Sequence, residues 1–125
     1  MCGSHKFFFV LFLLYMVMLC FLLFVNDLNV NYTRYPLEDK LIHFGAFFLG
    51  QLLILMAGKM NGFIRRTCYC LFLLLPVLAE IVQKYLPRRV SDVTDMLAAY
   101  LGIVVCIILW YTIKLIYKYF FLKER

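Results

Sequence analysis

Four long apolar segments constrain the fold of this chain more than any other feature of its sequence. They cover residues 7–25, 41–58, 68–79 with an extension to Leu86, and 96–113. A transmembrane helix needs about 20 mostly apolar residues to cross roughly 30 Å of hydrocarbon, and these segments take up most of a chain of 125 residues. Charged side chains make up only 16% of the sequence, against about 25% in soluble proteins. The sequence therefore excludes an ordinary soluble domain. It predicts an all-α fold, a four-helix transmembrane bundle that forms a single membrane domain over residues 1–125.

We expect the four helices to cover about residues 7–25, 39–58, 67–86 and 92–121. The first is expected to be a retained signal-anchor helix, because no small-x-small cleavage pattern follows Val25. Pro76 lies inside the third helix and should kink it. Ser91 or Asp92 can cap the fourth helix. At about 1.5 Å per residue the fourth helix would be roughly 45 Å long, so its end should protrude from the bilayer or tilt.

The distribution of basic residues predicts how the chain is oriented. The chain ends and the central loop hold eight basic residues against Glu124, namely Lys6, Lys59, Arg65, Arg66, Lys114, Lys118, Lys123 and Arg125. The other two loops and the helix ends beside them hold five, Arg34, Lys40, Lys84, Arg88 and Arg89, against six acids. Because Lys and Arg accumulate in cytoplasmic loops, both the N- and C-termini should be cytoplasmic. The same rule accounts for the net charge of +6, so no nucleic acid partner is expected.

Polar side chains accumulate near the outward ends of the second, third and fourth helices. Asp39 and His43 are four residues apart, so they share a helix face, and Asp92 and Asp95 are three apart. We expect these ends to meet around one vestibule lined by Asp39, His43, Glu80, Gln83, Arg88, Arg89, Asp92 and Asp95. Structural explanations compete: Asp92 can be a helix cap, and Asp39 and Lys40 can lie at the interface. Glu80 is the hardest to explain structurally, since a carboxylate at the centre of a transmembrane helix costs about 2.5–3.5 kcal/mol.

The candidate site residues fall into two sets according to their expected role. The candidates for proton transfer or other catalytic work are Asp39, His43, Glu80 and Asp95. The candidates for ligand binding are Lys40, Gln83, Arg88, Arg89 and Asp92. The carboxylates leave a divalent ion open as an alternative, but no spacing is diagnostic of a metal ion, and no metal site or cofactor is predicted. The five cysteines are expected to be free thiols, and Cys68-x-Cys70 lacks the second pair that a zinc site needs.

Three motifs resemble those of the VanZ-like family of small bacterial membrane proteins. Asp39-Lys40-Leu41-Ile42-His43 is similar to its D-K-x-x-H segment. Glu80-Ile81-Val82-Gln83 resembles E-x-x-Q, and the segment from Arg89 to Asp95, with Gly102 after it, resembles R-x-x-D-x-x-D. The resemblance covers about residues 36–106. The chain departs from the pattern at Ala99, where the family usually has Asn, and at Cys106, where a second glycine is common.

The resemblance implies a multi-pass protein of the bacterial cell envelope, in the inner (plasma) membrane, and the namesake of the family is associated with teicoplanin resistance. The leading hypothesis is an outward-facing site for an envelope lipid or lipid-linked glycan precursor, with Arg88 and Arg89 on its phosphate. The alternative is a membrane-embedded hydrolase or transferase acting on a lipid-linked substrate, so the sequence does not decide whether the protein is an enzyme. A small multidrug exporter is less favoured, because residues 7–25 contain no carboxylate. Membrane lipids are expected partners, and the oligomeric state stays open.

Overall fold

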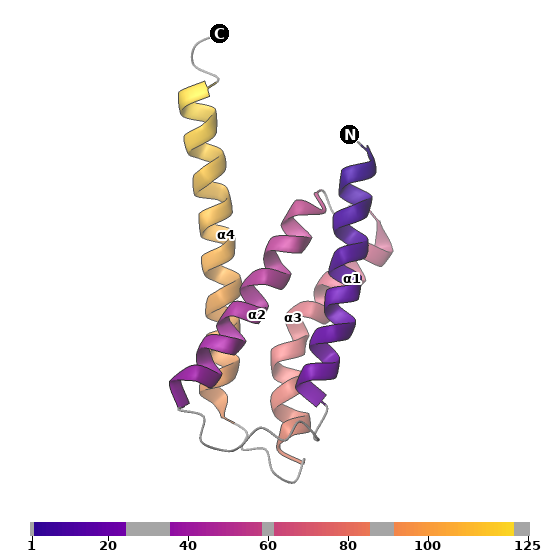
Figure 1. Cartoon of the computed structure of the whole chain (residues 1–125), viewed down its shortest axis with the longest axis vertical. Helices are drawn as coiled ribbons and strands as arrows, with labels where there is room; N and C mark the ends of the chain where they lie inside the picture. The colour runs from indigo at the N-terminus through magenta and orange to yellow at the C-terminus, as the bar shows by residue number, and fades with distance from the viewer. Residues whose placement is uncertain (1, 25–35, 59–61, 86–91, 122–125) are drawn as a thin grey trace.

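Four helices make up the part of the chain that the computed structural model describes, which is residues 2–24, 36–58, 62–85 and 92–121. The helices are α1 (Cys2–Phe24), α2 (Pro36–Met56), α3 (Phe63–Gln83) and α4 (Val93–Phe121), and these residues form no strand. All four are long and apolar enough to cross a membrane. The prediction of an all-α, four-helix transmembrane bundle is therefore confirmed (Figure 1), and the chain is a multi-pass membrane protein.

The helix boundaries differ from the expected ones by a few residues. α1 begins at Cys2 rather than near residue 7, because helical hydrogen bonding continues through the polar residues before the apolar segment. α2 begins at Pro36, since proline fits the first position of a helix, where an N–H would lack a partner anyway. α3 begins at Phe63 and ends at Gln83, so it is displaced towards the N-terminus of the chain. α4 begins at Val93 and ends at Phe121, almost as expected.

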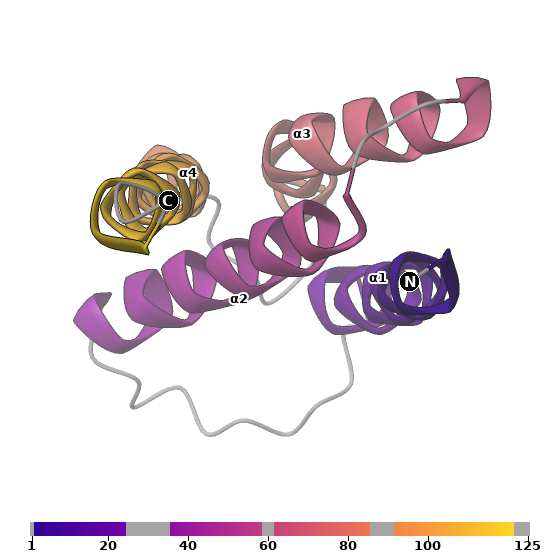
Figure 2. The ribbon, with the colours of Figure 1, turned by 90° about the horizontal axis from the view of Figure 1, so that it is seen from above.

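α2 lies at the centre of the arrangement. Seen from above, it crosses the molecule diagonally, with α1 on one side and with α3 and α4 on the other (Figure 2). Its longest contact is with α4. Gly102 of α4 makes this contact close, because a Cβ at that position would overlap the backbone carbonyl of Phe44 and lie 3.2 Å from the amide nitrogen of Phe48. A residue without a side chain is therefore what allows these two helices to touch through their backbones.

An aromatic core joins α1, α2 and α3. Phe12 of α1, Phe47 of α2 and Phe72 of α3 are all fully buried. The ring of Phe72 lies 5.7 Å from that of Phe12 and 5.4 Å from that of Phe47, measured between centroids. Two tyrosines add hydrogen bonds between helices: the hydroxyl of Tyr15 donates to the carbonyl of Ala46 at 2.7 Å, and that of Tyr100 donates to the carbonyl of Leu73 at 2.8 Å. Direct hydrogen bonds of this kind satisfy polar groups that the bilayer could not.

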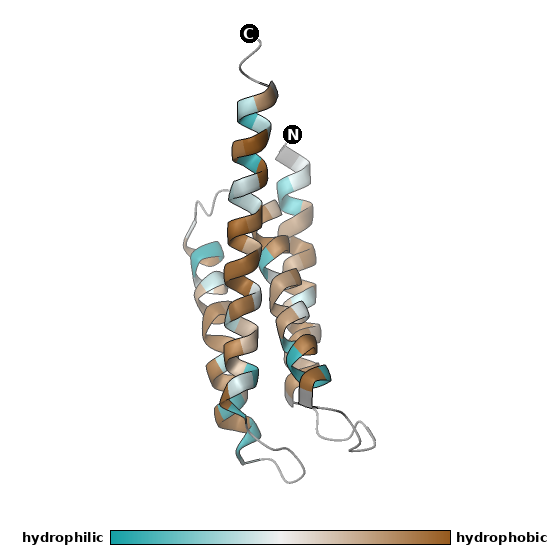
Figure 3. Ribbon diagram, turned by 90° about the vertical axis from the view of Figure 1, so that its left-hand side faces the viewer, coloured by the Kyte–Doolittle hydropathy of each residue, from teal (hydrophilic) through white to brown (hydrophobic). Residues whose placement is uncertain are grey.

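Apolar side chains cover the outside of the bundle, as expected for contact with lipid. Leu14, Val17 and Phe21 of α1 are 60–70% exposed, and Figure 3 shows apolar residues along the middle of the helices with polar residues near their ends. The last part of α4 projects beyond the other helices (Figure 1), and residues 111–120 are all exposed. The last part of α4 therefore extends past the other three helices, as its length of 29 residues allows.

Pro76 lies within α3, as predicted, and this helix changes direction partway along its length (Figures 1 and 2). Proline has no N–H to give to the carbonyl four residues earlier, so the helix loses one backbone hydrogen bond there and bends. Among the described cysteines, Cys20, Cys68, Cys70 and Cys106 are free thiols, as expected.

Candidate functional site

The first two turns of α2 present three polar side chains to α4. Asp39 and His43 are four residues apart and therefore lie on one face of the helix. His43 is buried, with 8% of its surface exposed, while Asp39 and Lys40 are half-buried. Glu38 and Asp39 belong to the first turn, where a carboxylate is favoured by the positive end of the helix dipole. The polar face of α2 therefore lies at the N-terminal end of this helix.

The start of α4 supplies two carboxylates with different surroundings. Asp92 caps this helix, because its Oδ1 accepts the backbone N–H of Thr94 at 2.9 Å. The capping role considered for Asp92 from sequence is therefore confirmed. Asp95 lies one turn further into the helix and is only 4% exposed. A carboxylate so deeply buried needs a cation, a proton or hydrogen-bond donors around it.

Lys40 joins the two helix starts electrostatically. Its Nζ lies 3.1 Å from Oδ2 of Asp92 and 3.6 Å from Oδ1 of Asp95. The pKa of Asp92 is lowered to about 2, first by hydrogen bonds from the hydroxyl and the backbone N–H of Thr94, and then by Lys40. Asp92 therefore stays ionised at any physiological pH. We refer to Asp39, Lys40, His43, Asp92 and Asp95 as the α2–α4 polar cluster.

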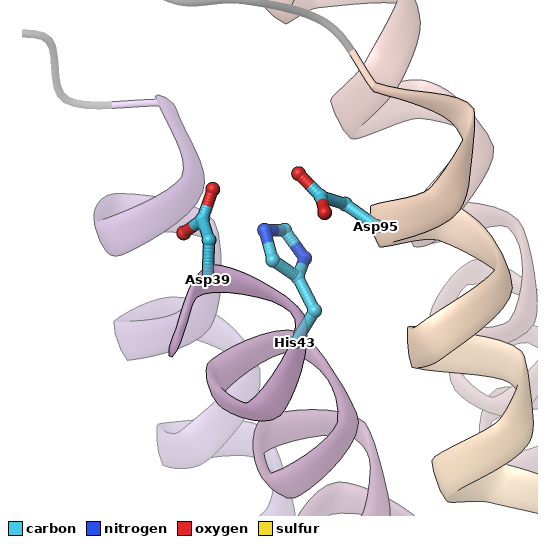
Figure 4. Close-up of side chains that lie close together, drawn as sticks. All are labelled: Asp39, His43 and Asp95. Atoms are coloured by element: carbon cyan, nitrogen blue, oxygen red, sulfur yellow. The ribbon is translucent and has the colours of Figure 1, made fainter. Parts of the chain in front are cut away.

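Three members of this cluster converge more closely. Asp39, His43 and Asp95 each present one potential ligand atom, and these atoms all lie within 4.8 Å of one another. Figure 4 shows the imidazole of His43 between the two carboxylates, with Asp39 and His43 coming from α2 and Asp95 from α4. Lys40 and Asp92 lie beside this group through the ion pairs described above. The arrangement is a carboxylate–imidazole–carboxylate set in which two of the three side chains are buried.

The other predicted site residues lie on α3 or outside the described residues. Glu80 and Gln83 are buried, at 9% and 2% exposure. Nε2 of Gln83 donates to the backbone carbonyl of Leu23 at 3.4 Å, so this side chain is directed towards α1. Arg88 and Arg89 fall in the segment 86–91, outside the residues that the structure describes. The structure thus brings five of the nine candidates together, and the contact that it gives for Gln83 is with α1.

Sequence reasoning missed the contact on which this cluster depends. The vestibule predicted from sequence includes residues of three helices, but the prediction did not show that α4 packs mainly along α2. The ion pairs of Lys40 were missed for the same reason. The glycine at position 102, two turns after Asp95, was the available signal for a close helix contact, although it does not say which helix the partner is.

Comparison of the chain with protein-family models, with curated proteins and with solved structures finds no match. The polar cluster must therefore be interpreted from its own geometry.

Proposed function

We propose that this protein lies in the inner (plasma) membrane of a bacterium and binds an envelope lipid or a lipid-linked glycan precursor at the α2–α4 polar cluster. The observation that carries the proposal is the convergence of five polar side chains from two helices at one end of a bundle whose outer surface is largely apolar. Ionisable groups within membrane-spanning helices are costly, and they usually mark a functional site. The α2–α4 polar cluster is therefore a better candidate for the site than any other described part of the chain.

The orientation of the bundle supports an outward-facing site. The start of α1 and the end of α4 lie at one end of the bundle, and the polar cluster lies at the other (Figure 1). The basic residues of the sequence favour cytoplasmic termini by eight to five. With that orientation the cluster opens to the outer surface, where precursors of a bacterial cell envelope are used.

The chemistry of the cluster suits a ligand that combines an anionic group with hydroxyl or amide groups. The side chain of Lys40 is 30% exposed, and its ammonium group can contact a phosphate oxygen. The carboxylate of Asp39 is half-buried and can accept hydrogen bonds from a sugar or peptide. Arg88 and Arg89 lie between α3 and Asp92 in the sequence, and would add forked hydrogen bonds to phosphate.

The resemblance to the VanZ-like family supports the same assignment. Asp39, Lys40, His43, Asp92 and Asp95, which form the polar cluster, all belong to the segments that carry the resemblance. The association of the family's namesake with teicoplanin resistance extends the proposal to glycopeptide antibiotic tolerance.

Lipid mass spectrometry of the purified protein tests this proposal. Wild-type protein extracted from a bacterial membrane should retain a lipid or lipid-linked species that is enriched over the bulk phospholipids. Lys40→Gln should lose that species, because it removes the ammonium group from the cluster. Lys84→Gln is the control for loss of a lysine outside the cluster, since Lys84 is exposed and follows α3. Equal retention by both variants would contradict the proposed site. Conversion of the retained species by the purified protein would instead indicate the membrane-embedded hydrolase or transferase.

A further inference from the structure

We propose that Asp39, His43 and Asp95 bind a divalent transition-metal ion, in the first place Zn²⁺. Two carboxylates and one imidazole are ordinary ligands of this ion. Each of the three residues offers one ligand atom, and no two of these atoms are more than 4.8 Å apart. The site joins the first two turns of α2 to the first turn of α4, and Asp39 is its half-buried member.

The spacing of the three ligand atoms is close to what zinc requires. Ligands at about 2.1 Å from a tetrahedral ion are about 3.4 Å from one another. The largest separation here, at most 4.8 Å, would have to shorten by up to about 1.4 Å to reach that spacing. Asp39 can make that adjustment by side-chain rotation, because it is half-buried in the first turn of a helix. His43 and Asp95, which are more than nine-tenths buried, would provide the fixed part of the site.

Asp95 points independently to a ligand. Its Oδ1 is fully buried, and no described residue forms a hydrogen bond with it. Nζ of Lys40 lies 3.6 Å from this oxygen, which is too far for a hydrogen bond. A buried carboxylate oxygen without a hydrogen bond lowers the stability of the folded protein, because the oxygen has lost its contacts with water. A metal ion placed between Asp95 and His43 would satisfy it directly (Figure 4).

Asp92 helps to keep Lys40 from occupying this position. One oxygen of Asp92 accepts the N–H of Thr94, and the other accepts a hydrogen bond from Lys40 at 3.1 Å. Asp92 is therefore already engaged on both oxygens, and Lys40 is held closer to Asp92 than to Asp95. Within the cluster, three carboxylates are opposed by one ammonium when His43 is neutral. The two negative charges that remain match the charge of a divalent ion.

The imidazole decides the class of metal. Mg²⁺ and Ca²⁺ prefer oxygen ligands, whereas imidazole nitrogen suits Zn²⁺ and its transition-metal neighbours. Three protein ligands also leave the fourth position of a tetrahedral zinc ion open. This second step rests on the proposed function: the open position would take a phosphate or carboxylate oxygen of the bound envelope lipid. Lys40, beside the metal, would then contact the same anionic group.

Zinc titration of the purified protein tests the metal site without any lipid ligand. The thiols are first blocked with N-ethylmaleimide, because cysteines also bind zinc. Wild-type protein should bind one Zn²⁺, and Mg²⁺ should not compete. Asp39→Asn should weaken zinc binding by more than the roughly 10–100-fold that loss of a supporting partner costs in metal sites. Glu38→Gln is the matched control, since Glu38 is exposed and next to Asp39, and it should bind zinc as wild type does.

Co²⁺ in place of Zn²⁺ provides a second readout that does not depend on a variant. Its visible absorption should show a low-symmetry site with nitrogen and oxygen ligands, and His43→Gln should change that spectrum while helical content is unchanged. Absence of stoichiometric zinc binding, or equal binding by wild type and Asp39→Asn, would overturn the inference. The lipid arm is separate: lipid retained equally with and without a chelator would leave the proposed function standing and exclude the metal from it. Zinc binding without lipid retention would leave the metal site standing and contradict the proposed lipid binding.

Discussion

The individual residues of the α2–α4 polar cluster have clearly divided roles. Asp92 caps α4 and holds Lys40, so its contribution is mainly structural. Asp95 is buried with an oxygen that no described residue hydrogen-bonds, and His43 lies between it and Asp39 (Figure 4). Buried polar groups without complete hydrogen bonding are uncommon, and each one requires an explanation. In this cluster the explanation that we favour is a bound ligand.

Substitution of Asp92 should separate its capping role from its ion pair. Asp92→Ala removes both and should lower the melting temperature of the purified protein. Asp92→Asn keeps a good capping side chain and should lower it less, through loss of the negative charge opposite Lys40. Thermal unfolding in detergent, followed by circular dichroism, measures both variants. Equal losses would mean that the cap contributes nothing.

The lowered pKa of Asp92 predicts how the stabilisation by its carboxylate depends on pH. The pKa falls from 3.8 to about 2 in the folded protein, so ionised Asp92 stabilises the fold. That contribution is fully present above pH 3.8 and is lost as the pH falls towards 2. The difference in melting temperature between wild type and Asp92→Asn should therefore be constant near neutral pH and shrink below pH 3.8. A difference that shrank already between about pH 7 and pH 5 would have to come from another group.

Glu80→Gln tests whether the buried carboxylate of α3 transfers protons. Glutamine has nearly the same shape and still forms hydrogen bonds, but it cannot carry a proton to or from a substrate. We expect the variant to accumulate at least as well as wild type and to retain the same lipid, because no charge then has to be held within the bundle. A variant that accumulates normally but loses function would support the enzyme, since proton transfer is worth about 10²–10⁴ in rate.

At the scale of the helices, the close crossing of α2 and α4 determines where the polar groups meet. Gly102 permits that crossing because its missing side chain would overlap the carbonyl of Phe44. The same crossing brings Lys40 within reach of Asp92 and Asp95. The cluster thus depends on a glycine that lies two turns away from it and carries no chemistry of its own.

Gly102→Ala should push α2 and α4 apart. Because the added methyl group meets backbone and not a flexible side chain, we expect destabilisation of about 1–3 kcal/mol, as for other overpacked positions. Gly45→Ala is the matched control: no atom lies within 4 Å of the added Cβ, and removing a helical glycine should stabilise α2 by up to about 1 kcal/mol. Unfolding of both variants in mixed micelles measures the difference. Equal stability would mean that the crossing is not as close as described.

The sequence predicts the helices well and their neighbours poorly. An apolar segment as long as residues 7–25 predicts a helix in lipid, because a helix satisfies its backbone hydrogen bonds within the segment. It gives little information on which face is buried, since the segment is apolar on all sides. Asp39 and His43 could be placed on one face from their spacing alone. That Asp95, and not Glu80, stands opposite them depends on the contact at Gly102, which spacing cannot reveal.

The whole molecule is a thin, asymmetric bundle with different chemistry at its two ends. The polar cluster lies at one end, and the opposite end carries the basic, aromatic last turns of α4, with Lys114 and Lys118. Nζ of Lys114 lies 4.9 Å from the ring of Trp110, a cation–π contact typical of an interface where aromatic and basic residues gather. This asymmetry agrees with a basic end facing the cytoplasm and an acidic cluster facing outward.

Topology reporters test that orientation. Alkaline phosphatase fused after Tyr85, which follows α3 at the same end of the bundle as the polar cluster, should be exported and therefore active. The same reporter fused after Gly62, before α3, should be inactive, while a fluorescent protein at that position should fluoresce. Both expectations follow from the larger number of basic residues around the termini and the central loop. The opposite pattern would place the cluster in the cytoplasm and remove the support for an envelope ligand.

Photocrosslinking at the two ends of the bundle tests the proposed site most directly. A photoreactive amino acid at Val93, beside the cluster, is compared with one at Ile64, in the first turn of α3; these positions are 62% and 69% exposed. Adducts at Val93 should include an enriched envelope lipid or precursor that is absent at Ile64 and is lost when Lys40→Gln is added. Identical adducts at both positions, consisting of bulk phospholipid alone, would contradict ligand binding at the α2–α4 polar cluster.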